Sequence, residues 1–178
     1  MRRLLAIKCS YDPISIALLK NAEHAPLEEI VESIRSRAQP HLEMGISFVS
    51  DVPPGLSVPR RLFETVLGHL IGNAFKSMRD PGTGRVELSA AIDGASLIVL
   101  VQDTGVGLTE RELGRIFIPL VRRASLPVQG EAGTGSGLGL SIVKRLIESA
   151  GGTITAKSQR GQGTVFEVKL PLSIIQNC

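Results

Sequence analysis

Three polar side chains recur at helical spacing within an otherwise apolar stretch of the chain. His69, Asn73 and Lys76 are four and three residues apart, so in a helix they occupy one face. An asparagine carbonyl oxygen suits a hard cation such as Mg²⁺, and a lysine supplies a point charge that suits phosphate. The pattern is compatible with a site for a metal-bound phosphate. The solvated face of an ordinary amphipathic helix would show the same pattern.

A carboxylate stands at the end of an apolar run and is followed by two glycines. Residues 103–107 read Asp-Thr-Gly-Val-Gly. The Asp103 carboxylate could accept a hydrogen bond from the amino group of adenine, while bare glycine backbone lets a ligand approach closely. A plain glycine turn remains an alternative. Asp-Thr-Gly is also the triplet of aspartic proteases, but the long helical patterns elsewhere in the chain argue against that almost all-β class.

A glycine-rich run leads directly into a helical pattern. Residues 133–140 read Gly-Thr-Gly-Ser-Gly-Leu-Gly-Leu, and Leu138, Ile142, Leu146 and Ala150 follow at helical spacing. The exposed N–H groups at a helix N-terminus bind phosphate. No Lys-Ser/Thr pair follows the glycines, and the Gly-x-Gly-x-x-Gly spacing is missing, so neither common nucleotide fingerprint applies. The unbroken transition into a helix favours a phosphate site over a flexible linker.

The elements that must position these residues follow from apolar periodicity. Helices are predicted over residues 26–38, 60–79 and 138–150, with a short one over 109–117. Strands are predicted over residues 45–50, 85–92, 96–102, 153–157 and 164–170. Residues 119–136 have no period, which predicts a mobile loop. This order lacks the strict alternation of a doubly wound sheet, so it predicts an α/β two-layer sandwich: a mixed β-sheet with helices on one face.

Composition excludes several classes of protein. The chain has 178 residues, enough for one domain, and its 20 basic and 17 acidic residues leave a net charge of only +3. That excess is too small to indicate nucleic acid, and five phenylalanines, one tyrosine and no tryptophan provide no base-stacking platform. Two cysteines near opposite ends form neither a disulfide framework nor a metal cluster. We therefore expect a cytoplasmic protein that contacts neither nucleic acid nor, through this domain, a membrane.

The motifs, taken together and in this order, resemble the ATP-binding catalytic domain of bacterial sensor histidine kinases. They are the helix with Asn73, the Asp-x-Gly-x-Gly run at 103–107, the glycine run at 135–140, and Gly161-x-Gly-Thr at 161–164. This family shares its fold, of the Bergerat type, with the gyrase, Hsp90 and MutL ATPases. The resemblance covers residues 26–172. It leaves an N-terminal segment, 1–25, of unknown role and a C-terminal tail, 173–178.

The resemblance implies ATP and Mg²⁺ as ligands and a role for each matching residue. Asn73 would coordinate Mg²⁺, Lys76 would lie near the phosphates, and Asp103 would bind adenine. His69, Asn73 and Lys76 would form the catalytic group. The other implied ATP-binding positions are Thr164 beside the adenine, Gly105 and Gly107 at the pocket floor, Gly135, Gly137, Leu138 and Gly139 at the phosphate side, and Arg122 in a lid over residues 108–136.

Three departures from the family pattern affect the functional prediction. His69 stands where the family usually has asparagine, and the lid motif appears as Phe-Ile-Pro-Leu at 117–120, without its acid and second aromatic residue. Neither His24 nor His41 has the sequence of a phosphoacceptor, and both are predicted to be surface histidines. The resemblance therefore implies transfer to a histidine on a separate dimerisation and phosphoacceptor domain, and then to a response regulator. A serine kinase of the anti-sigma-factor type and a non-catalytic nucleotide-binding interaction module are the alternatives.

Overall fold

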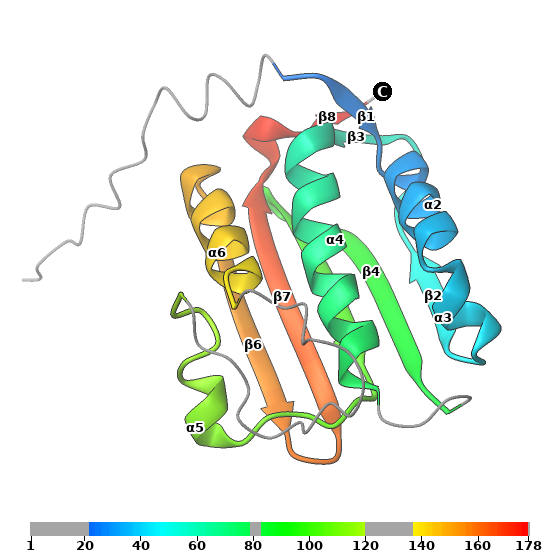
Figure 1. Cartoon of the computed structure of the whole chain (residues 1–178). Coiled ribbons are helices and arrows are strands. Elements are labelled where there is room, and N and C mark those ends of the chain that lie inside the picture. Colours follow the sequence, from blue (N-terminus) through cyan, green and yellow to red (C-terminus); the bar gives the residue numbers. More distant parts are fainter. Residues whose placement is uncertain (1–21, 79–82, 120–136, 178) are drawn as a thin grey trace, which may run out of the picture.

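Two layers make up the computed structural model, which describes residues 22–78, 83–119 and 137–177 (Figure 1). A five-stranded sheet forms one layer, and helices packed on one of its faces form the other. The helices are α2 (Leu27–Arg37), α3 (Gln39–Glu43), α4 (Arg60–Ser77), α5 (Glu110–Leu113), α6 (Gly139–Ser149) and the 3-10 turn η1 (Leu172–Ile174). The strands are β1 (His24–Pro26), β2 (Ser47–Asp51), β3 (Leu56–Pro59), β4 (Arg85–Asp93), β5 (Ser96–Asp103), β6 (Thr153–Gln159), β7 (Gly163–Pro171) and β8 (Gln176–Asn177). The predicted α/β sandwich is confirmed.

The main sheet is mixed, as predicted. Its strand order is β2-β4-β5-β7-β6, with β2 parallel to β4 and every other neighbouring pair antiparallel. Strand β5 is central, and Asp103 is its last residue. The turn at Gly94, where φ is +57°, joins β4 to β5 in a hairpin, as is typical of an Asp-Gly pair between two strands.

The core lies between α4 and the inner face of the sheet. Alternate residues of β5 and β7 point to this face, and Leu97, Val99, Val101, Val168 and Leu170 are each at most 2% exposed. Helix α4 contributes nearly a complete apolar face, whose fully buried members include Leu67, Leu70 and Ile71. Helices α2 and α6 pack against α4. This packing fixes the C-terminal half of α4 over the end of β5, where the predicted site residues lie.

A second sheet, β1-β3-β8, was not predicted from the sequence. Its strands have three, four and two residues, which is too short for an alternating pattern to be recognised. Arg60, the first residue of α4, forms ion pairs with Glu29 of α2 at 2.7 Å and with Glu23, which precedes β1, at 3.1 Å. These ion pairs connect the small sheet to α2 and α4. The hydrogen bond to Glu29 raises the pKa of Arg60.

One short helix was not predicted and another needs correction. Helix α3 follows α2 directly, with Pro40 in its first turn, where a missing N–H leaves no helical bond unmade. The helix predicted over 109–117 is only Glu110–Leu113. Thr109 caps it through a reciprocal pair of hydrogen bonds with Glu112, and Gly114 ends it. Of the loop predicted over 119–136, residues 120–136 lie outside the described residues.

The two histidines expected at the surface are half-buried, so that prediction is wrong. Both ring nitrogens of His24 face carbonyl oxygens, Nδ1 at 2.8 Å from Ala22 and Nε2 at 3.2 Å from Ile174. His41 stacks on Phe75, with ring centroids 4.6 Å apart and planes 5° from parallel. Polar contacts therefore hold His24 in place, and ring stacking holds His41. Within the part of the chain that the structure describes, no helix is long and apolar enough to cross a membrane.

Candidate functional site

Asp103 ends β5 with its carboxylate buried and held by two donors. The residue is 4% exposed, and its Oδ1 accepts hydrogen bonds from the Gly105 N–H at 2.8 Å and from the Ser77 hydroxyl at 2.9 Å. Because a buried carboxylate is costly without such bonds, these donors both stabilise Asp103 and fix its orientation. The structure thus places the predicted adenine carboxylate against the end of α4.

Ser77 contacts the candidate carboxylate of Asp103, and the sequence interpretation missed it. It is the last residue of α4, is 2% exposed, and also lies 2.7 Å from the carbonyl oxygen of Ala74, so its one proton is shared between two acceptors. Serine at a helix end is common, and its type alone indicates no site. One signal was present, because Ser77 follows Asn73 by four residues and so shares the face of the predicted polar group.

Gly105 and Gly107 are required by the close approach of neighbouring segments. A β-carbon on Gly105 would overlap Oγ of Ser77, and one on Gly107 would overlap the carbonyl oxygen of Gln159. Gly107 also has a φ of +61°, which side chains disfavour. Gly163 shows the same constraint, since a β-carbon there would overlap the carbonyl oxygen of Asp103. The turn after β5 is therefore packed tightly between α4 and the β6–β7 hairpin.

Thr164 lies directly opposite Asp103 in the antiparallel pairing of β5 with β7. Residues that face each other across two strands project to the same side of the sheet, here the side that α4 covers. Thr164 is 2% exposed, and its hydroxyl oxygen lies 3.0 Å from that of Ser158. The fold therefore brings the two residues predicted for adenine into one buried pair.

The phosphate-side residues of α4 and α6 also meet. Helix α6 packs against α4, and a β-carbon placed on Gly139 would lie 3.1 Å from Nδ1 of the half-buried His69. Asn73 is half-buried and Lys76 is exposed on the same face of α4. The imidazole of His69 is therefore packed against the first residue of α6, a contact that its spacing from Asn73 alone did not predict.

The remaining predicted residues divide into two groups. Gly137, with a φ of +68°, and the partly exposed Leu138 lead into the N-terminus of α6. Arg122 and Gly135 lie outside the described residues, as does most of the predicted lid.

The candidate site suits Mg²⁺ that is bound together with phosphate, rather than a metal ion held by protein ligands alone. Among the described residues, no three His, Cys, Asp or Glu side chains are grouped so that they could hold a metal ion. Mg²⁺ bound with a nucleotide takes few protein ligands and is completed by phosphate oxygens and water. The amide oxygen of Asn73 fits that requirement.

A pocket of about 330 Å³ opens beside the turn that follows β5. Residues 104–106, Thr83 and Gly84, and Arg160 and Gly161 contribute to its wall. Asp103 and Thr164 do not line it. The pocket thus reaches Gly105, whose N–H donates to Asp103, without including the buried pair itself.

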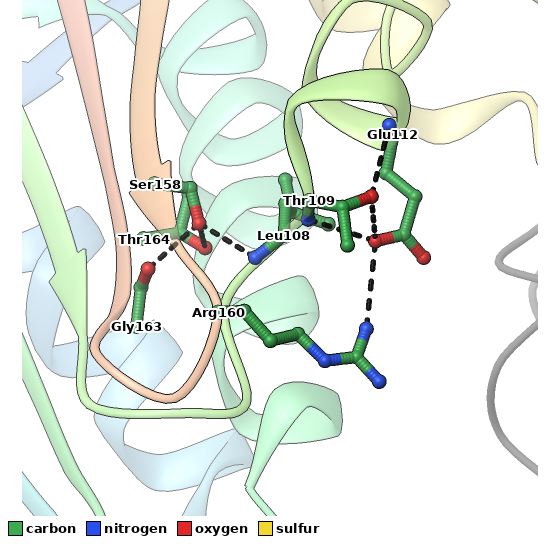
Figure 2. A network of polar contacts seen from close by, with 7 residues as sticks. All are labelled: Leu108, Thr109, Glu112, Ser158, Arg160, Gly163 and Thr164. Atoms are coloured by element: carbon green, nitrogen blue, oxygen red, sulfur yellow. Dashed lines mark hydrogen bonds and ion pairs between the residues drawn. The ribbon is translucent and has the colours of Figure 1, made fainter.

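A polar network connects Thr164 to the helix α5 (Figure 2). Ser158 contacts both Thr164 and the Leu108 N–H, and Leu108 directly precedes the Thr109–Glu112 cap of α5. Arg160 lies 3.5 Å from Glu112. That partly exposed ion pair contributes at most about 1 kcal/mol, so the buried hydroxyl contacts dominate this connection.

The comparison with protein families identifies one model. The family described as Histidine kinase-, DNA gyrase B-, and HSP90-like ATPase matches residues 58–174. Among curated proteins, an uncharacterized sensor-like histidine kinase of Rhizobium meliloti is 37% identical over 132 residues, which are 72% of this chain and 24% of that protein. The autoinducer 2 sensor kinase/phosphatase LuxQ of Vibrio cholerae is 40% identical over 114 residues, which are 62% of this chain and 13% of LuxQ. The chain thus spans a quarter or less of the length of these relatives.

Solved structures share the fold. The mycobacterial sensor histidine kinase MprB is 25% identical with a TM-score of 0.71, covering 88% of this chain and all of that one. Full-length ShkA in complex with AMPPNP is 28% identical with a TM-score of 0.70, covering 93% of this chain and 35% of ShkA. The arrangement of sheet, α4 and α6 is therefore that of histidine kinase catalytic domains.

Proposed function

Because the chain belongs to the family of histidine kinase-, DNA gyrase B- and HSP90-like ATPases, we propose that it binds Mg·ATP and transfers the γ-phosphoryl group to a histidine on a separate domain. The observation that carries this proposal is the buried Asp103 carboxylate, held by Ser77 and Gly105 and lying opposite Thr164. The family match supports ATP as the ligand, the similarity to sensor kinases supports transfer to a histidine, and the geometry supports these residues as the site.

The adenine base would be recognised by Asp103. Its carboxylate accepts hydrogen bonds, so it suits the 6-amino group of adenine and repels the carbonyl oxygen that guanine carries there. A hydrogen bond to a charged group contributes about 1.5–3 kcal/mol, which corresponds to a tenfold or larger preference. Thr164 would support the base from the neighbouring strand, and Gly105 and Gly107 would form the floor.

The phosphates would lie between α4 and the N-terminus of α6. The N–H groups at Gly137, Leu138 and Gly139 would bind phosphate oxygens with help from the positive end of the helix dipole. Lys76 would neutralise phosphate charge, and the amide oxygen of Asn73 would hold Mg²⁺. Bound Mg²⁺ would neutralise charge on the phosphate oxygens.

His69 would act as a positioning residue beside this group. Its ring rests against Gly139, so it would hold the first turn of α6 at a fixed distance from Asn73. We place Arg122 and Gly135 in the same site on the resemblance alone, with residues 108–136 as a lid, of which the structure describes residues 108–119, including α5. Residues 26–172 would form the ATP-binding unit, flanked by segments 1–25 and 173–178.

The nucleophile would come from the partner, a histidine of a dimerisation and phosphoacceptor domain, and a response regulator would receive the phosphoryl group next. The two curated relatives described above are named as sensor kinases, and the ShkA structure holds the ATP analogue AMPPNP. Catalysis would then depend mainly on positioning and charge neutralisation, as in other phosphoryl transfers.

A phosphotransfer assay tests the proposal. The chain is mixed with γ-labelled ATP, Mg²⁺ and a purified phosphoacceptor domain of a sensor histidine kinase. We expect label on the acceptor that is stable in base and lost in acid, as phosphohistidine is, and about tenfold less of it with Asp103→Ala at subsaturating ATP. Acid-stable label would instead indicate a serine kinase. Bound ATP without any transfer would indicate a nucleotide-binding interaction module.

A further inference from the structure

The hydroxyl of Ser158 joins β6 to the start of β7 and to Leu108, which lies 50 residues earlier in the sequence (Figure 2). It accepts a hydrogen bond from the Leu108 N–H at 2.8 Å, donates to the carbonyl oxygen of Gly163 at 2.7 Å, and lies 3.0 Å from the hydroxyl oxygen of Thr164. Ser158 is half-buried in β6 and is paired with Thr164 across β6 and β7. These contacts determine where each hydroxyl proton must lie.

A serine hydroxyl has one proton and two lone pairs. The carbonyl oxygen of Gly163 can only accept, and at 2.7 Å from the oxygen of Ser158 it requires the proton between them. The Leu108 N–H can only donate, so it uses one lone pair of Ser158. The second lone pair is then the position for a proton from Thr164. Thr164 is therefore the donor in the contact between the two hydroxyls.

From this proton count we infer that Ser158 is a specificity-determining residue, because it makes the Thr164 hydroxyl an acceptor toward a bound base. With its proton directed at Ser158, Thr164 presents only oxygen lone pairs to a ligand. Asp103 stands opposite Thr164 and also accepts hydrogen bonds. A base bound against this pair meets two acceptors, which favours an exocyclic amino group over a carbonyl oxygen at the same position. This inference rests on the proposed binding of ATP.

The matched probe is inosine triphosphate, which differs from ATP by a carbonyl oxygen in place of the 6-amino group and a proton on N1. The wild type should prefer ATP. In Ser158→Ala the Thr164 proton loses its acceptor and becomes able to donate to the inosine carbonyl. One such hydrogen bond corresponds to about a tenfold change in affinity, so the ratio of the ATP affinity to the inosine triphosphate affinity should fall by about that factor.

Two further variants separate specificity from folding. Thr155→Ala removes an exposed hydroxyl from the same strand, on the outer face of the sheet, and should keep the wild-type ratio. Ser158→Thr retains the hydroxyl and should keep that ratio too. Hydrogen exchange of the Leu108 amide should be faster in Ser158→Ala alone, since only that variant removes its acceptor. Thermal melting confirms that each variant tested is folded.

Calorimetric titration of both nucleotides into each variant decides the question. A reduced ratio in Ser158→Ala, with the wild-type ratio in Ser158→Thr and Thr155→Ala, supports the inference. An unchanged ratio in folded Ser158→Ala, or an equally reduced ratio in Ser158→Thr, overturns it. A wild type that binds neither nucleotide would instead contradict the proposed function, so the two failures are distinguishable.

Discussion

Ser77→Ala probes the contact that orients the candidate adenine carboxylate. The substitution keeps the β-carbon beside Gly105 and removes only the hydroxyl that donates to Asp103 at 2.9 Å. A hydrogen bond to a buried charged group contributes about 1.5–3 kcal/mol. Because the Ser77 proton is shared with the carbonyl oxygen of Ala74, we expect the lower end, a loss of about 1.5 kcal/mol in the free energy of unfolding.

Ser141→Ala is the matched control for this measurement. Like Ser77, Ser141 is a helical serine that donates to the carbonyl oxygen three residues earlier, here Leu138 at 2.8 Å, but its hydrogen bond is exposed to solvent and the acceptor is a neutral carbonyl group. Its loss should change stability by about 0.5 kcal/mol or less, as is usual for surface positions. The difference between the two variants isolates the contact with Asp103.

Urea denaturation followed by circular dichroism provides the free energies, and a double-mutant cycle with Asp103→Ala provides the coupling. We expect Ser77→Ala to cost about 1.5 kcal/mol in the wild-type background and much less in the Asp103→Ala background. Equal effects in both backgrounds would refute the reasoning. An effect of Ser77→Ala no larger than that of Ser141→Ala would also refute it.

Two other predictions concern glycine packing and the phosphate side. Gly105→Ala should destabilise the fold by about 1–3 kcal/mol, because its β-carbon would overlap Ser77. Gly68→Ala, in the open middle of α4, should instead stabilise the fold by about 0.5–1 kcal/mol. Thermal melting compares the two variants, and equal melting temperatures would contradict the packing argument. His69→Ala, which removes the ring packed on Gly139, should lower the phosphotransfer rate more than the ATP affinity, while His69→Asn should keep most of the transfer. Parallel kinetic and calorimetric measurements test this, and a variant with both quantities unchanged would show that His69 is only structural.

The fold was predictable where long elements carry a regular pattern. The alternation of β4, the continuous apolar run of β5 and the apolar face of α4 made these elements predictable, and they place Asp103 at the end of a central strand. The short strands β1, β3 and β8 were not predictable, because strands of two to four residues have no measurable period.

The candidate site was predictable in its glycines and charged residues but not in its hydroxyls. Asp103 stands out because a carboxylate is unusual at the end of an apolar strand. Gly107 stands out because glycine tolerates the positive φ that a tight turn after a strand requires. Ser77 and Ser158 do not stand out, since serine is common on surfaces and in turns. Their importance arises from contacts across 26 and 50 residues of sequence, to Asp103 and Leu108, and only the folded chain brings those segments together.

The most direct test of the account is a calorimetric titration of ATP and GTP into the wild type and Asp103→Ala, with Mg²⁺ present. We expect the wild type to bind ATP at least about tenfold more tightly than GTP, and Asp103→Ala to lose about that factor for ATP while remaining folded. Equal affinity of the wild type for the two nucleotides, or an unchanged ATP affinity in Asp103→Ala, would contradict the assignment of Asp103 as the residue that recognises adenine.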